Sequence, residues 1–378
     1  MTRHQWLAAH ARRSKHVIGV RVRWLCATMI ALALIISSCT AAPGPSLPGA
    51  PPPSNQVGPL PAECAGRVTE PDQASAALQR VRPGSIVCLS GDGLADAELE
   101  VTTSGTPQQP ITIVADGATM RSLNVNADYV VIQGLTLRDG DGLTMAGRGL
   151  VARNNVVYNA TADGVECRDC GSTIIESNVV QRADGTGIWI SGEGITVRNN
   201  TVSESVLRTQ GDADGIRFFG VGHRLTGNTI KDIKASGYAD DPRGGPHTDC
   251  FQTFNTASDP PTYDIVIADN ICTNVDVQCL IATAKEGGAR SSPAGQTAIT
   301  FENNTCSVNG SQAVLLENFP HVIVRGNRFS GPSTRAVQLG MGSTDCAVIG
   351  NTMTGRMRPF EIDRQSRPGF QEGGNTSR

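Results

Sequence analysis

Two short acidic segments in the middle of the chain carry the residue types that acid–base chemistry requires. Asp214 and Asp249 each begin an alternating polar and apolar run, and Asp212 and His247 stand two residues before them. If the two segments meet in space, the carboxyls repel unless they share a proton or a cation, so a pKa should rise or a metal should bind. Paired carboxyls around a sugar linkage are what glycoside hydrolysis requires. We therefore expect Asp214 and Asp249 to be catalytic.

Other polar side chains near this pair are candidates for supporting roles. His247 could orient or tune the carboxyls, and Arg217 could hold a substrate hydroxyl or carboxylate. The same Asp-Gly pattern also marks turns that enter strands, and it recurs at Asp141 and Asp163, so a structural role for the acids stays open. Four side chains are expected to contact substrate: Trp189, Glu166, Gln252 and Lys285.

The segments that would position these residues repeat along the chain. An apolar-x-apolar-x-x-Asn-x-apolar phrase recurs about every 22 residues, and a second alternating phrase lies between its copies. Period-two alternation is typical of strands with one buried face, and the lack of Leu two residues after the Asn argues against a leucine-rich repeat. A β-solenoid with at least two strands in each repeat is therefore predicted. The repeated Asn stands at positions 155, 178, 200, 228, 270, 304, 327 and 351.

These phrases resemble the right-handed parallel β-helix, or pectate-lyase-like, superfamily over about residues 85–363. The resemblance implies an all-β, single-stranded right-handed parallel β-helix of about 10–11 coils, in which like residues stack about 4.8 Å apart and the Asn side chains form a ladder. An amphipathic helix over 71–81 is predicted to cap the N-terminal end. In such a fold Asp214 and Asp249 occupy the same position in successive coils. We call such a set of stacked positions a column.

The acidic segments also resemble two motifs of the polygalacturonase family, at Asp212–Asp214 and Thr248–Cys250. In that family the positions of Asp214, Thr248 and Asp249 form the acid–base set. The resemblance implies hydrolysis of a polysaccharide, although Thr248 replaces one carboxylate, and the later Gly-His-Gly and Arg-Ile-Lys motifs of the family are missing from this sequence.

Two alternatives to hydrolysis remain open. Lyases of the same superfamily use an Arg or Lys base with Ca²⁺, so Arg217 or Lys285 could be the base, while Asp212 and Asp163 could hold the ion. No cofactor is certain, and Ca²⁺ is the one that a lyase or epimerase would need. The other alternative is a non-catalytic glycan-binding or adhesion protein, with Trp189 among the residues that line its groove.

Extra chain is inserted only in the coils between Asn200 and Asn304. Insertions in a solenoid emerge as loops on one face, often the binding face. We expect these loops to wall a cleft over the acidic column. The insertions are residues 203–213, 231–248, 256–263 and 286–297.

The N-terminal segment has the features of a targeting sequence. It carries six basic and no acidic residues, and its apolar run at 24–36 has signal-peptide length. Ile36–Cys39 resembles a bacterial lipobox, which implies a lipid on Cys39 and attachment to a membrane, although an ordinary signal peptide stays open. The predicted organisation is a lipoprotein signal peptide at 1–38, a Pro-rich tether at 39–62, a β-helix domain at 63–363 and a disordered tail at 364–378.

Charge and cysteine content are consistent with an extracytoplasmic, carbohydrate-directed protein. Beyond residue 38 the chain has 26 basic and 35 acidic residues, so non-specific binding to nucleic acid is not expected. We expect a monomer that binds a polysaccharide. Nine cysteines besides Cys26 and Cys39 predict several disulfides and at least one free thiol. The expected pairs are Cys64 with Cys88, Cys250 with Cys279, and Cys272 with Cys306.

Overall fold

The structure is a computed structural model that describes residues 64, 66–209, 211–238, 245–255, 261–284 and 295–378. The expected signal peptide, the Pro-rich tether, the lipidation residue Cys39 and the substrate-binding candidate Lys285 lie outside these residues. Four disulfides among the described residues indicate an extracytoplasmic compartment. In the same part of the chain, no helix has both the length and the apolar character needed to cross a membrane.

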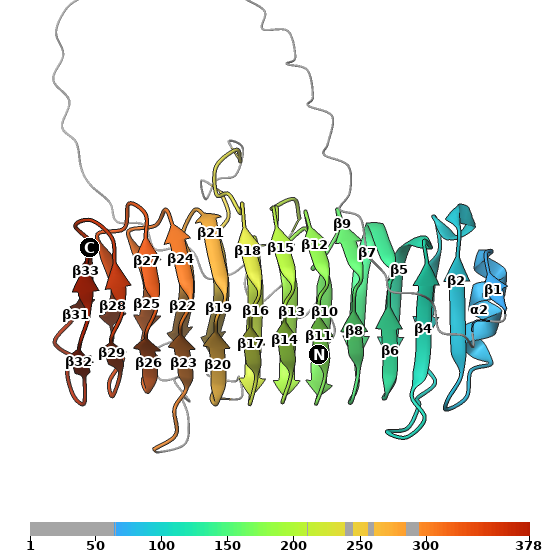
Figure 1. Cartoon of the computed structure of the whole chain (residues 1–378), viewed down its shortest axis with the longest axis horizontal. Helices are drawn as coiled ribbons and strands as arrows, with labels where there is room; N and C mark the ends of the chain where they lie inside the picture. Colours follow the sequence, from blue (N-terminus) through green and yellow to red (C-terminus); the bar gives the residue numbers. More distant parts are fainter. Residues whose placement is uncertain (1–63, 65, 210, 239–244, 256–260, 285–294) are drawn as a thin grey trace, which may run out of the picture. The chain divides into compact units, whose positions relative to one another are not determined.

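Parallel strands wind into a β-solenoid of about 12 turns, which confirms the predicted fold class (Figure 1). One side of every coil belongs to a 13-stranded sheet. Its strands are β1 (Arg67–Val68), β2 (Ile86–Ser90), β4 (Ile111–Asp116), β6 (Val130–Gln133), β8 (Val151–Arg153), β11 (Ile174–Glu176), β14 (Thr196–Arg198), β17 (Arg224–Thr226), β20 (Ile265–Ala268), β23 (Ile299–Glu302), β26 (Val322–Arg325), β29 (Ala347–Ile349) and β32 (Gln371–Gly373).

The other strands form a 20-stranded sheet that bends around the coil. Strand β7 makes the bend visible, because its first residues pair with β9 and its later residues with β10. The strands before the bend are β9 (Val156–Tyr158), β12 (Val179–Gln181), β15 (Thr201–Ser203), β18 (Thr229–Lys231), β21 (Ile271–Val275), β24 (Thr305–Val308), β27 (Arg328–Ser330), β30 (Thr352–Met353) and β33 (Thr376–Ser377). The others are β3 (Glu98–Val101), β5 (Thr119–Asn126), β7 (Thr136–Ala146), β10 (Val165–Gly171), β13 (Thr186–Glu193), β16 (Asp214–Val221), β19 (Asp249–Asn255), β22 (Gln278–Ala284), β25 (Gln312–Glu317), β28 (Arg335–Gly340) and β31 (Arg358–Ile362).

The repeated asparagines form the expected ladder inside the stack. The Oδ1 atom of Asn228, for example, accepts both the backbone N–H and the side-chain Nδ2–H of Asn200 at 3.0 Å. The residue before each rung turns the chain with a left-handed φ, 56° at Asn199 and 65° at Gly227, which explains why Asn or Gly recurs there. Each buried amide is thus satisfied by its neighbours in the stack.

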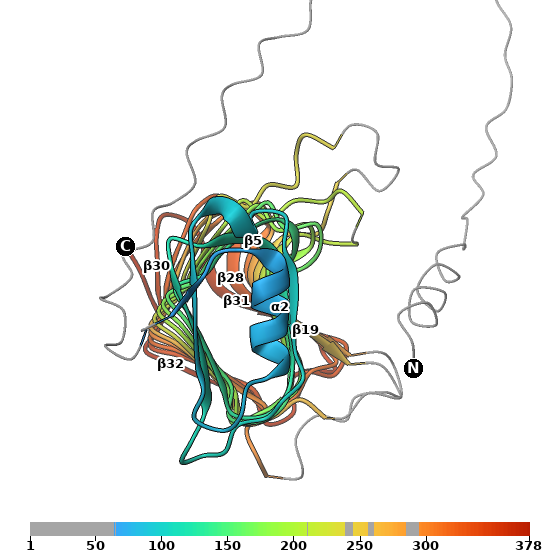
Figure 2. The same ribbon diagram turned by 90° about the vertical axis from the view of Figure 1, so that its right-hand side faces the viewer.

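The prediction for the N-terminal end of the solenoid is confirmed, whereas the C-terminal end differs from its prediction. Helix α2 (Pro71–Gln79) lies across the first coil with Ala74 and Leu78 buried, which confirms the predicted cap (Figure 2). The polar residues 364–378, by contrast, are not without structure: β32 and β33 pair with β29 and β30. Asn375 continues the ladder, because its Oδ1 accepts from Asn351 at 3.0 Å.

The cysteine pairs agree only in part with the expectation. Cys64–Cys88 is confirmed, and Cys346 is a buried free thiol. Cys167 also pairs with Cys170. The two expected pairs along the columns are wrong, since the structure has Cys250–Cys272 and Cys279–Cys306. Side chains at paired positions of parallel strands stand side by side, whereas those on two faces that meet at a corner of the coil point toward each other, which is the geometry a disulfide requires.

Candidate active site on the central coils

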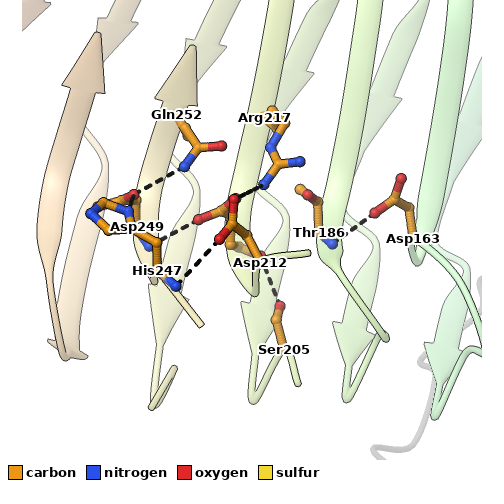
Figure 3. Close-up of polar contacts among 9 residues, drawn as sticks. Asp163, Thr186, Ser205, Asp212, Arg217, His247, Asp249 and Gln252 are labelled. Carbon is orange, nitrogen blue, oxygen red and sulfur yellow. Dashed lines mark hydrogen bonds and ion pairs between the residues drawn. The ribbon is translucent and has the colours of Figure 1, made fainter. Parts of the chain in front are cut away.

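The register of β16 and β19 places the two acidic segments side by side. Ile216 pairs with Phe251 and Arg217 with Gln252, so Asp214 and Asp249 occupy neighbouring positions at the strand starts. The backbone N–H of Asp249 donates to Oδ1 of Asp214 at 3.1 Å. Figure 3 shows Asp249 with His247 and Gln252, and Arg217 on the neighbouring strand. Both carboxyls have 0% exposed surface. The acids that the sequence selects therefore do meet, but they lie beneath other side chains.

Asp214 is covered by Arg217. The guanidinium donates to Oδ2 of Asp214 and lies 3.4 Å from Oδ2 of Asp212, and its side chain is 14% exposed. Burial raises the pKa of Asp214 to about 7, against the opposing effect of the Arg217 charge, and the nearby Asp249 and Asp212 charges raise it further. Burial thus opposes ionisation of this carboxyl, and the Arg217 charge favours it.

Asp249 forms a dyad with His247. Nδ1 of His247 lies 2.7 Å from Oδ2 of Asp249, and Nε2 of Gln252 donates to the same oxygen at 3.3 Å. The backbone N–H of Gln278 donates to Oδ1 at 3.0 Å. The hydrogen bond to Asp249 raises the pKa of His247 to about 9, although burial acts in the opposite direction. With its side chain 40% exposed, His247 is an imidazolium at neutral pH that can reach solvent.

Asp212 is the exposed carboxyl of this group, at 33% of its side-chain surface. Its Oδ1 accepts the backbone N–H of His247 at 3.3 Å. Burial raises its pKa, and the charges of Arg217 and His247 oppose that rise. Ser205, which was not predicted as a site residue, holds the strand start by donating to the carbonyl of Asp214 at 2.8 Å. The solvent-facing groups are therefore Asp212, Arg217 and His247.

The other predicted contact residues lie on the same face. Glu166, Trp189, Arg217 and Gln252 share one column across β10, β13, β16 and β19. Gln252 is buried against Asp249. The indole of Trp189 is partly exposed, but the guanidinium of Arg168 lies 4.6 Å from its ring centre and is itself paired with Glu166.

Two aromatic side chains beside this column were missed in the sequence. The ring centres of Trp189 and Phe219 are 5.4 Å apart, and those of Phe219 and Phe254 are 5.1 Å apart. Phe219 and Phe254 stand two residues after Arg217 and Gln252 on their strands, so strand alternation could have found them. Thr248 is buried, and its hydroxyl has no hydrogen-bond partner within the described ranges. It supplies no acid–base group in place of the carboxylate of the polygalacturonase motif.

The structure describes both predicted Ca²⁺ ligands, Asp163 and Asp212. Asp163 pairs through β13 with the column of Asp214, two coils away, or about 10 Å. Its Oδ1 accepts the backbone N–H of Thr186 at 2.7 Å. The binding of Ca²⁺ by Asp163 and Asp212 stays a prediction. Within the described residues, the one group of three close potential ligands is Cys250, Cys272 and Cys279, which are all disulfide-bonded.

The predicted loops are described only in part. Leu207 donates its backbone N–H to the hydroxyl of Tyr238 at 3.1 Å, so the insertions 203–213 and 231–248 contact each other. Much of 256–263 and 286–297 lies outside the described residues. The expected cleft therefore stays a prediction.

The coils that carry this site match a known family pattern. Residues 141–291 match the family model described as a right-handed β-helix region. The chain contains a right-handed β-helix. The match includes both β16 and β19, and a comparison with curated proteins finds no match.

Several solved structures are similar to this chain. Pectate lyase Pel9A is 16% identical with a TM-score of 0.45, covering 65% of this chain and 72% of the lyase. A tailspike protein double mutant of the E. coli bacteriophage HK620, in complex with a pentasaccharide, is 11% identical with a TM-score of 0.45, covering 83% of this chain and 60% of its own. A lacto-N-biosidase of Eubacterium ramulus is 12% identical with a TM-score of 0.45, covering 81% and 64%. The chain thus spans less than two thirds of the latter two proteins, and a shared fold does not fix an activity.

Proposed function

We propose that the protein is an extracytoplasmic glycoside hydrolase that acts on a polysaccharide at the cluster on β16 and β19. The observation that carries the proposal is a pair of solvent-facing groups: His247, hydrogen bonded to the buried Asp249, and Asp212, which shares the Arg217 guanidinium with the buried Asp214. Hydrolysis of a glycosidic bond needs one proton donor and one carboxylate that acts as nucleophile or base. The paired acids Asp214 and Asp249 then support the reacting groups from beneath.

His247 is assigned as the proton donor. Asp249 holds Nδ1–H and stabilises the imidazolium, so the Nε2 proton is free to pass to the glycosidic oxygen as the carbon–oxygen bond breaks. Asp212 is assigned as the carboxylate that takes the proton of the attacking water or attacks the sugar carbon itself. Its raised pKa makes it a stronger base than an ordinary aspartate.

Arg217 and the aromatic side chains next to it are assigned to substrate binding. The guanidinium is anchored by Asp214 and still reaches the surface, where it can donate to a sugar hydroxyl or carboxylate. Phe254 lies 5.9 Å from that guanidinium and Phe219 packs beside it. Aromatic rings stack on the apolar faces of sugars, so these residues form a platform beside Arg217.

The test is cleavage of a panel of neutral and uronate-containing polysaccharides by the full chain, with release of reducing ends as the readout. We expect His247→Gln and Asp212→Asn to lose activity by about 10²–10⁴-fold, the usual contribution of an acid–base group. Asp141→Asn is the matched control, because Asp141 occupies the column of Asp214 in an earlier coil and is exposed. It should retain wild-type activity.

Three results would reject this assignment. Full activity in both variants would remove His247 and Asp212 from the chemistry. Products with an unsaturated uronide end would show a lyase. Tight glycan binding without any cleavage would show the non-catalytic alternative.

We also propose that the protein is held at a membrane by a lipid on Cys39, on the basis of the lipobox-like Ile36–Cys39. Expression in a bacterium with a radioactive or clickable fatty acid should label the wild-type chain. Cys39→Ser should abolish the label and release the protein from membranes. Labelling that persists in Cys39→Ser would refute the assignment.

A further inference from the structure

The last coils of the solenoid differ in charge from the rest of the protein. Residues 321–378 contain eight arginines and only four acidic residues, whereas the chain as a whole has more acidic than basic side chains. An excess of cationic side chains in one region of an acidic protein concentrates anions there. The last coils are therefore the place to look for an anion-binding site.

A surface groove of about 470 Å³ lies among these arginines. It runs between two neighbouring turns, one before β28 and one before β31, and Arg356 and Arg358 line it. The turn before β28 contributes the hydroxyl-bearing Ser333 and Thr334. The groove is made of residues 331–334 and 354–358.

The positive charge in this groove is only partly neutralised. Glu361 is the acidic partner of both Arg358, at 2.8 Å, and Arg335, at 3.6 Å. Arg335 is held further by Gln312 and Gln338. Arg356 is exposed, and no acidic side chain pairs with it in the described part of the chain. One carboxylate thus serves two guanidiniums, and Arg356 is left to bind a ligand.

The groove is continuous with the candidate active site through strand register. Starting from Asp249, the strand-start column passes through Gln278, Gln312 and Arg335 to Arg358. Four steps at the spacing of parallel strands amount to about 19 Å. A polymer that lies along this edge of the coils from His247 toward the C-terminal end would reach Arg356 and Arg358 several sugar units away.

We propose that this groove is an oxyanion-binding site that holds a carboxylate or sulfate group of a glycan. A guanidinium binds such planar or tetrahedral oxyanions through pairs of N–H groups. In this groove Arg356 has no acidic partner, and Arg358 has only the exposed Glu361, which it shares with Arg335 and can exchange for a ligand. That the oxyanion belongs to a glycan rests on the proposed function; oxyanion binding itself does not. The site makes an acidic polysaccharide the substrate class, with its charge recognised away from the scissile bond.

The test is calorimetric titration of the full chain at low salt with four probes: sodium sulfate, a uronate oligosaccharide, a sulfated oligosaccharide and a neutral oligosaccharide. We expect the two acidic oligosaccharides to bind more tightly than the neutral one, and sulfate to compete with them. Arg356→Gln should weaken their binding about tenfold, since it removes a charge-assisted hydrogen bond. Glu361→Gln should strengthen it, because Arg358 and Arg335 lose their internal partner.

Arg328→Gln is the matched control, as Arg328 is an exposed arginine of the same coils that does not line the groove. It should leave affinity within about twofold of wild type. Equal losses in Arg328→Gln and Arg356→Gln, or unchanged binding in Glu361→Gln, would overturn the site. Binding of sulfate without either acidic oligosaccharide would overturn its assignment to a glycan. Because sulfate cannot be cleaved, its affinity does not depend on turnover, and a failure of the proposed hydrolysis would be seen separately, in the cleavage assay.

Discussion

The imidazole of His247 rests on the carboxylate of Asp249, with Nδ1 2.7 Å from Oδ2, and the carboxylate is wholly buried while the ring is partly exposed. This order matters for chemistry. The buried group cannot touch a polymer, but it fixes the ring and keeps a proton on it, so the reacting atom is the outer ring nitrogen. The Asp249–His247 dyad is therefore a proton donor facing solvent.

Removal of the Asp249 charge should lower the pKa of His247. The hydrogen bond to Asp249 is the largest cause of the rise to about 9, so in Asp249→Asn we expect the pKa to fall toward the ordinary histidine value of 6.5. The alkaline limb of the rate profile should shift to lower pH in parallel, because the imidazolium is the active form. Titration of the His247 ring by NMR measures the shift directly. An unchanged His247 titration in Asp249→Asn would contradict the dyad.

Asp163 should make the protein less stable as pH rises. Burial raises its pKa from 3.8 to about 6, so the folded state binds a proton that the unfolded chain has lost between these values. Its stabilising contribution is complete below pH 3.8 and disappears as pH rises through 6. We expect Asp163→Asn to be more stable than wild type at pH 7, by on the order of 2–3 kcal/mol, and to match it near pH 4. Urea unfolding across this range tests it, and parallel curves for the two proteins would refute it.

His223 should make the protein less stable as pH falls, which is the opposite of the effect of Asp163. Its Nδ1 accepts the backbone N–H of Ile195 at 3.2 Å, and Nε2 faces the carbonyl of Phe219 at 2.9 Å. Burial lowers its pKa, with the Arg224 charge acting the same way and Asp264 opposing it. The unfolded chain therefore takes up a proton first as pH falls through about 6.5, and stability is lost below that pH.

In His223→Gln, which cannot titrate, we expect a smaller loss of unfolding free energy between pH 7 and pH 5 than in wild type. Thermal or denaturant unfolding at the two pH values measures the difference. If the variant lost as much stability as wild type over this interval, His223 would not be the group responsible.

The interior of the amide ladder should be far more sensitive than its end. Asn304 is fully buried, donates to the carbonyl of Ile267 and to Oδ1 of Asn327, and accepts from Asn270. We expect Asn304→Ala to cost about 3 kcal/mol or more, since it leaves several buried groups unpaired. Asn375→Ala, at the partly exposed last rung, should cost about 1 kcal/mol because water can replace the lost bonds. Equal costs in urea unfolding would argue against the ladder as a source of stability.

Much of the fold was predictable because the same physical demand recurs in each coil. Every buried bend needs an amide that both donates and accepts, and Asn therefore marks the register from 155 to 351. The strands of the last coil were not predicted, because this coil has a neighbour on only one side. Its outer side faces solvent, so residues 371–377 are polar and lack the apolar pattern, and only Asn375 carries the signal.

The sequence was sufficient to predict which residues of the site are neighbours, but not how deeply each of them is buried. Column register was sufficient to bring Asp214 beside Asp249. Which side chains cover them depends on the close approach of the chain at Gly215, where an added Cβ would meet Ile230 at 2.6 Å and the carbonyl of Cys250 at 2.7 Å. Strand alternation does not describe such a close approach. The disulfide partners were missed for a related reason, since they depend on how two faces meet at a corner of the coil.

The ladder of amides also limits how a chain of this kind can change in length. Each rung gives hydrogen bonds to one neighbour and receives them from the other, as Asn270 does between Asn228 and Asn304. Excision of a complete turn would rejoin two equivalent rungs, whereas excision of half a turn would leave one rung opposite an unrelated side chain. Relatives of this protein should therefore be longer or shorter by whole turns, and differ otherwise only in the excursions between strands.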